Sequence, residues 1–91
     1  MIARVATVER LDPSGLSGAN VELLRQTVRS APGFRAGYHL RNTETGKALS
    51  ISIFESREAG EGARDALAQR PSDKRVNIEP DAVEFYEVIE F

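Results

Sequence analysis

This chain of 91 residues has no cysteine, no tryptophan and only one histidine. The lack of cysteine excludes disulfide bonds and thiolate metal sites, and a single histidine excludes a zinc site built from histidines. A domain this short buries only about 60–65% of the surface that its unfolded chain exposes, so its core is small. Small domains often compensate with disulfides, metals or a partner subunit. We therefore expect no metal and a partner subunit.

The chain also lacks an excess of charge of one sign. Its 12 basic and 14 acidic residues give a net charge of −2. A surface for nucleic acid or for an anionic membrane would need clustered positive charge, so neither partner is expected. No apolar run approaches the ~20 residues of a membrane span, and the charges at Arg4 and Glu9 do not fit a signal peptide. We expect one cytoplasmic domain over residues 1–91.

What is present is a regular alternation of strand and helix patterns. Residues 1–9 are rich in β-branched side chains and predict a strand. A helix follows, with Ser17 as its N-cap and Pro32-Gly33 as its end. Apolar residues at helical spacing indicate its buried side: Val21, Leu24, Val28 and Ala31.

Two further strands, over residues 34–41 and 47–54, are predicted to form a hairpin. The polar connection at residues 42–46 ends in Gly46, which suits the left-handed position of a hairpin bulge. The second of these strands alternates between apolar and small polar residues. A hairpin in the middle of the chain makes antiparallel pairing the expected arrangement.

A second helix and a last strand complete the pattern. Ser56 is a suitable N-cap, Glu58 in the first turn is favoured by the helix dipole, and Pro71 ends the helix. Residues 76–78 have the composition of a short extended piece, and residues 82–91 predict the final strand. The order is therefore βαββαβ.

This order predicts an α+β, ferredoxin-like sandwich: a four-stranded antiparallel sheet with two helices on one face. RNA-recognition domains share the order but stack bases on aromatic residues of their first and third strands. The first strand here has no aromatic residue. Acylphosphatases carry a glycine-arginine anion loop after the first strand, which residues 10–15 do not resemble. Neither function is expected.

Neither face of the predicted sheet has the residue pattern that is typical of a solvent-exposed face. In the strand 47–54, one face carries large apolar residues, and the other carries small polar residues together with Phe54. The last strand has large apolar residues on both of its faces. A half-exposed sheet alternates apolar with charged residues, so the helix-free face needs a cover. A second copy of the chain would supply one through a two-fold interface. The alternative is a monomer with a mildly apolar sheet face, since exposed apolar atoms are common.

Two segments resemble those of a known family. They are Pro32-Gly33-Phe34-Arg35-Ala36-Gly37-Tyr38 at the second strand, and Ser50-Ile51-Ser52-Ile53-Phe54-Glu55-Ser56-Arg57-Glu58-Ala59 at the third strand and second helix. With the order of elements, they make the chain similar to the dimeric α/β-barrel superfamily, and most similar to the antibiotic biosynthesis monooxygenase (ABM) domain family. The resemblance implies a homodimer whose two sheets pack face to face into a barrel. It also implies a pocket between each sheet and its helices.

The resemblance has consequences for chemistry. Some relatives oxidise aromatic polyketides with dioxygen and no cofactor, and others degrade haem. Haem-degrading relatives use an asparagine on the first strand and a histidine on the second helix, and this chain has neither. Many relatives have a tryptophan where this chain has Phe54. Haem degradation is therefore not expected, and we expect the chain to use no cofactor.

The resemblance also implies which face holds the pocket. Ser50, Ser52 and Phe54 would face the helices, opposite a second helix with small residues such as Ala63. Small residues on both walls would leave room for a ligand, or would instead let helix and sheet pack closely with no cavity. The other face would be the dimer interface, with Leu49, Ile51 and Ile53 as its candidates.

Three further side chains are candidates for ligand contacts. Tyr38 and Tyr86 could offer hydroxyl groups, although buried tyrosines commonly serve as amphipathic packing residues. His39 is the weak catalytic candidate, because an imidazole titrates near neutral pH and could exchange a proton with a bound phenol. A structural hydrogen bond is the alternative role for His39.

Two functions follow as hypotheses. The first is an ABM-like dimeric barrel that binds a small apolar or aromatic molecule and oxidises it as a cofactor-independent monooxygenase. The second is a non-catalytic dimeric module that serves as an accessory or stress-related protein. The sequence leaves open whether the chain is an enzyme.

Overall fold

The computed structural model describes residues 1–10, 19–69 and 80–91. The sequence predictions at Ser17, Pro71 and residues 76–78 lie outside the described residues. The elements are β1 (Ile2–Val8), α1 (Ala19–Arg29), β2 (Phe34–Arg41), β3 (Ala48–Phe54), α2 (Arg57–Ala68) and β4 (Ala82–Glu87). The predicted βαββαβ order is confirmed.

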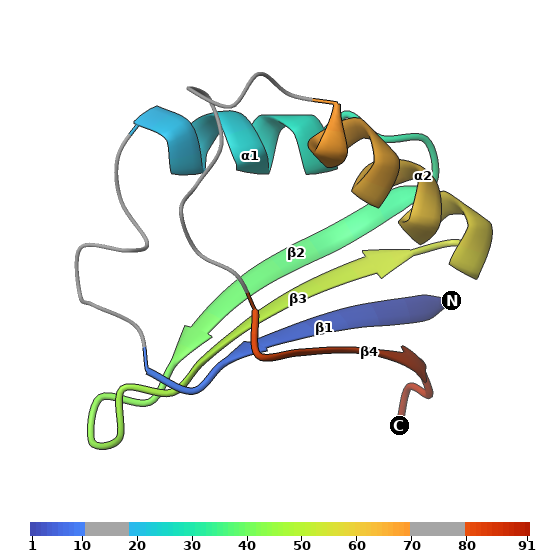
Figure 1. Cartoon of the computed structure of the whole chain (residues 1–91). Helices are drawn as coiled ribbons and strands as arrows, with labels where there is room; N and C mark the ends of the chain where they lie inside the picture. The colour runs from blue at the N-terminus through green and yellow to red at the C-terminus, as the bar shows by residue number, and fades with distance from the viewer. Residues whose placement is uncertain (11–18, 70–79) are drawn as a thin grey trace.

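The four strands form one antiparallel sheet in the order β2-β3-β1-β4. Figure 1 shows both helices on the same side of this sheet, and no described element covers its other side. We call this uncovered side the helix-free face. The predicted α+β ferredoxin-like fold, with two helices on one face of a four-stranded sheet, is confirmed.

The hydrophobic core lies between the sheet and the helices. Phe54 on β3 is only 1% exposed, and its ring meets the Phe34 ring edge-on at 5.9 Å between centroids. Gly60 on α2 lies directly above, because a Cβ there would be 3.3 Å from both the Phe54 ring and the Phe85 ring. Ala63, one turn later, is also buried. Small residues thus let α2 approach the aromatic side chains of the sheet.

Local signals in the sequence fix the start of α2. The Ser56 hydroxyl accepts a hydrogen bond from the Ala59 amide at 3.2 Å, and Glu58 lies in the first turn. Both features satisfy or complement the free amides of the first turn. The helix ends at Ala68, where the Gln69 amide donates to the Asp65 carbonyl at 3.1 Å. The predicted cap is confirmed.

The hairpin between β2 and β3 is also confirmed. The Asn42 amide donates to the Lys47 carbonyl at 2.8 Å, and the Gly46 amide donates to the Asn42 carbonyl at 2.9 Å. The Asn42 side chain accepts from the amides of Glu44 and Thr45. Gly46 has a φ of 78°, a conformation that favours glycine. The polar connection therefore closes on its own hydrogen bonds.

The last strand is shorter than predicted. β4 ends at Glu87, not at residue 91, and only the Val88 amide continues the pairing, to the Met1 carbonyl at 3.0 Å. Because β4 runs antiparallel to β1, Glu87 already pairs with Ile2, the first residue of that strand. Ile89 lies beyond the pairing and is largely exposed.

Gly33 connects α1 to β2 at a crowded position. Its φ is 82°, and its carbonyl accepts a hydrogen bond from the Glu55 amide at 2.8 Å. A Cβ on Gly33 would lie 2.8 Å from the Ala59 Cβ of α2, closer than such atoms approach in proteins. Glycine is thus required here by both conformation and space.

We predict that Gly33→Ala destabilises the fold more than Gly46→Ala. Both substitutions place a side chain at positive φ, at a cost of about 1–2 kcal/mol. Only Gly33 adds a clash, since a Cβ on Gly46 meets nothing within 4 Å. Overpacking adds about 1–3 kcal/mol. Urea unfolding of the two variants measures the difference, and equal losses would show that α2 shifts freely.

Candidate functional site

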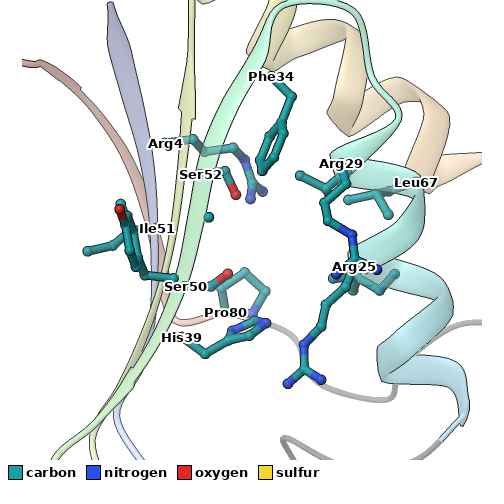
Figure 2. A pocket seen from close by; sticks show the side chains of 14 residues that line it. Arg4, Arg25, Arg29, Phe34, His39, Ser50, Ile51, Ser52, Leu67 and Pro80 are labelled. Atoms are coloured by element: carbon teal, nitrogen blue, oxygen red, sulfur yellow. The ribbon is translucent and has the colours of Figure 1, made fainter.

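A cavity of about 440 Å³ lies on the helix side of the sheet. Figure 2 shows it between the strands and α1. Its lining comes from three strands, both helices and the start of the β4 segment: Arg4, Leu24, Arg25, Val28, Arg29, Phe34, Gly37, Tyr38, His39, Ser50, Ile51, Ser52, Leu67 and Pro80. The volume falls in the range of small-molecule pockets, roughly 300–1,000 Å³.

The floor of the cavity is polar. Arg4 on β1 pairs directly with Ser52 on β3, and His39 on β2 pairs directly with Ser50. Residues paired in this way share one face of the sheet. In Figure 2 these side chains extend from the strands into the space before α1. The sheet thus presents two hydroxyls, one guanidinium and one imidazole to the cavity.

The walls of the cavity are mainly apolar. Leu24 and Val28 from α1, Leu67 from α2 and Phe34 from β2 contribute to them. The Phe34 ring lies over Gly37, where a Cβ would be 3.3 Å from it. The lack of a side chain at residue 37 therefore lets the ring form part of the wall.

Two arginines of α1, Arg25 and Arg29, line the cavity on its helix side. Arg29 is bound to Glu22 by an ion pair of 2.8 Å, and Arg25 lies 3.6 Å from the same carboxylate. The hydrogen bond from Arg29 is the main reason why the pKa of Glu22 is lowered. Glu22 itself does not line the cavity. No other described carboxylate lines it either, so its surface carries an excess of positive charge.

Arg4 is in an unusual setting for a charged side chain. Its Nε is buried and has no hydrogen-bond partner in the part of the chain that the structure describes. Burial lowers the pKa of Arg4, and the positive charge of Arg64 lowers it further. A buried N–H without a partner costs free energy, because its bond to water is lost and not replaced.

His39 is affected by the same surroundings. Burial lowers the pKa of His39 below its ordinary value of 6.5, and the charge of Arg25 lowers it further. The imidazole is therefore mainly neutral at neutral pH, with one nitrogen able to accept a proton. This is the state that a general base requires.

The structure separates the six residues that the sequence suggested for a pocket. Ser50 and Ser52 line the cavity. Phe54 and Ala63 are fully buried in the core beside it and do not line it. Tyr86 pairs with Ala3 on the helix-free face, where it is 49% exposed. Tyr86 is therefore placed away from the cavity.

Tyr38 shares the helix-free face with its direct partner Ile51 and is 56% exposed. Both residues border the cavity at the strands, but Figure 2 shows Ile51 directed away from it. The pairing places Leu49 and Ile53 on the same face, together with Val5 of β1. The three residues suggested for an interface thus lie together on the helix-free face.

The sequence did not identify the arginines of the cavity. Arg4 stands in a strand of mainly apolar residues, which is a signal that its side chain points to a special environment. The pairing of Arg4 with Ser52 depends on strand order, which the sequence pattern did not specify. Arg25 and Arg29 follow Glu22 at helical spacing and have the pattern of ordinary surface ion pairs.

Residues 1–10, 19–69 and 80–91 contain neither a metal-binding cluster nor a membrane-spanning helix. No group of three histidine or carboxylate side chains among them could hold a metal ion. No helix in these ranges is both long and apolar enough to cross a membrane.

Comparisons with known proteins were informative only at the level of structure. No family model matches the chain, and no curated protein matches it in sequence. A protein from Bordetella bronchiseptica named as an antibiotic biosynthesis monooxygenase superposes with a TM-score of 0.73 and 17% identity, covering 98% of this chain and 97% of that one. A protein from Mycobacterium tuberculosis superposes with a TM-score of 0.65 and 18% identity, covering 99% of this chain and 96% of that one.

A third similar structure contains a ligand. It is a monooxygenase of Streptomyces coelicolor in complex with nanaomycin D, with a TM-score of 0.63 and 19% identity. The match covers 99% of this chain and 88% of that one. At these identities the comparisons establish a shared fold. The structural resemblance to ABM domain proteins, suggested by the sequence, is confirmed at that level.

Proposed function

We propose that this chain binds a small, largely apolar or aromatic molecule in the cavity between its sheet and α1. The observation that carries the proposal is the cavity itself, with about 440 Å³, apolar walls and a polar floor. Pockets for small molecules combine these properties, because apolar walls supply affinity and a few polar groups supply orientation. The ligand in the Streptomyces coelicolor structure supports the proposal by analogy of fold.

We further propose that the chain acts as a homodimer through its helix-free face. That face carries Leu49, Ile51 and Ile53 at its centre, with the half-exposed Tyr38 and Tyr86 on the flanking strands. An uncovered sheet face that carries several large apolar residues is typical of interfaces. Stable interfaces bury roughly 800 Å² on each partner, an area that a four-stranded sheet can supply.

An oxygenase reaction is consistent with the polar floor of the cavity. The neutral His39 imidazole would accept the proton of a bound phenol, and the phenolate formed reacts more readily with dioxygen. The phenol would be oxidised to a quinone and would itself supply the four electrons: one oxygen atom of dioxygen becomes the new carbonyl oxygen of the ring, and the other leaves as water with the two hydrogens lost by the phenol. The observation that favours a non-catalytic module is that no described carboxylate in the cavity orients His39.

Oxygen consumption in the presence of hydroxylated naphthalenes and anthracenes tests these alternatives. We expect consumption by the wild-type chain and a loss of about 100-fold or more in His39→Ala, the usual size of a general-base contribution. Thr43→Ala, in the exposed hairpin, is the control and should not change the rate.

Binding without oxygen consumption would favour the non-catalytic module. Consumption that survives in His39→Ala would exclude His39 as the base. If calorimetry detects no binding of any aromatic compound of the panel at millimolar concentration, the proposed binding function is wrong.

A further inference from the structure

The charges that line the cavity point to a more specific ligand than an apolar molecule. Among the described lining residues there are three arginines and no carboxylate. Arg25 and Arg29 share the single carboxylate of Glu22, which lies outside the cavity. Arg4 has no ion pair among the described residues. A neutral ligand would leave the charge of Arg4 without a counter-ion in the cavity.

Among the three arginines, Arg4 is the one whose charge a bound anion would compensate most. Its Nε is buried without a hydrogen-bond partner, and Figure 2 shows the side chain extending from β1 into the cavity. Desolvation makes the charged guanidinium unfavourable, as the lowered pKa of Arg4 indicates. An anionic oxygen in the cavity would accept hydrogen bonds from the part of the guanidinium that faces it and would compensate the charge in the same contact.

The surroundings of Arg4 restrict the shape of such a ligand. Ser52, its direct partner on β3, offers a hydroxyl beside the guanidinium. The Phe34 ring and Leu67 lie on the apolar side of the same cavity. A flat aromatic body would contact this wall while an acidic group reached the floor. The cavity thus combines an anion site and an aromatic site within one volume.

We propose that the ligand of this cavity is an aromatic acid whose carboxylate binds the Arg4 guanidinium while its ring packs against Phe34 and Leu67. This inference rests on the proposed binding function and adds the charge of the ligand and the residue that recognises it. Arginine is suited to the role, because its planar fork of N–H donors matches the two oxygens of a carboxylate.

The test compares two probes of the same shape, 2-naphthoate and 2-naphthamide, by isothermal titration calorimetry at pH 7. The probes share the ring and differ in charge. We expect naphthoate to bind the wild-type chain at least about tenfold more tightly, because hydrogen bonds to charged groups contribute about 1.5–3 kcal/mol. In Arg4→Met, which keeps an unbranched apolar stem and removes the guanidinium, this preference should disappear while naphthamide binding stays within about twofold.

Arg35→Met is the matched control. It removes one positive charge from the chain, but Arg35 does not line the cavity and pairs with Glu55 at 2.6 Å. The naphthoate preference should therefore be retained in this variant. A preference lost equally in both variants would indicate attraction by net charge and would overturn the assignment to Arg4.

A measurement on the wild-type chain covers the case in which Arg4→Met does not fold. The Nε–Hε resonance of Arg4 in a ¹⁵N spectrum should shift more on addition of naphthoate than on addition of naphthamide, because only naphthoate brings a charge to the guanidinium. Equal binding of both probes, with no shift of this resonance, would refute the anion site and leave the proposed binding function intact. No binding of either probe would refute both.

Discussion

An Ile51→Glu variant should be a monomer at protein concentrations at which the wild-type chain is a dimer. Ile51 lies at the centre of the helix-free face, paired with Val5 of β1 and Tyr38 of β2. In the proposed dimer a carboxylate at this position would be buried without a partner, at a cost of several kcal/mol. We expect the dissociation constant to rise by at least about 100-fold, which corresponds to about 2.8 kcal/mol. Multi-angle light scattering from 1 to about 100 µM measures it.

Leu23→Glu is the control for this experiment. It makes the same kind of change at an exposed leucine of α1, away from the helix-free face, and should leave the mass unchanged. Circular dichroism would show that both variants are folded. A wild-type chain with the mass of one subunit over the whole concentration range would contradict the dimer.

Phe54→Ala should lower the free energy of unfolding by about 3–5 kcal/mol, the usual loss for a buried phenylalanine. Phe54 is 1% exposed and contacts both the Phe34 ring and the α2 backbone at Gly60. The resulting cavity should stay open, because Gly60, which faces it, has no side chain with which to fill it. Since domains are stable by only about 5–15 kcal/mol, this loss is a large fraction of the total and should lower the urea midpoint clearly.

Phe91→Ala provides the control, because it is the same substitution at a phenylalanine that is fully exposed. Its unfolding midpoint in urea should stay close to that of the wild-type chain, within about 0.5 kcal/mol. Losses of similar size in the two variants would show that the Phe34–Phe54 contact does not hold the core together.

The fold was largely predictable because its signals are local. Ser56 caps α2, Gly46 closes the hairpin, and the alternation along β3 separates the two faces of the sheet. Each of these depends on residues close together in the sequence. The end of β4 was not predictable, since it depends on where β1 stops offering partners, at Ile2.

The site was predictable only in part, because it depends on pairing between distant strands. The alternation of β3 puts Ser50 and Ser52 on one face, the family resemblance assigns that face to the pocket, and both residues line the cavity. Tyr86 was assigned to the pocket, but its parity in β4 places it beside Ala3 on the helix-free face. The sequence does not point to Arg4, because its place beside Ser52 depends on the β1–β3 pairing, which joins residues 48 positions apart.

Neighbouring residues of β1 point in opposite directions, and this has a consequence for how the sheet assembles. Arg4 belongs to the polar floor and Val5 to the apolar side, so a slip by one position would exchange every such pair. The guanidinium of Arg4 would then lie on the apolar helix-free face, and the side chain of Val5 would take its place beside the serines of the cavity floor. Each slipped register would therefore lose free energy at both positions. These two losses favour a single alignment of β1 in the sheet.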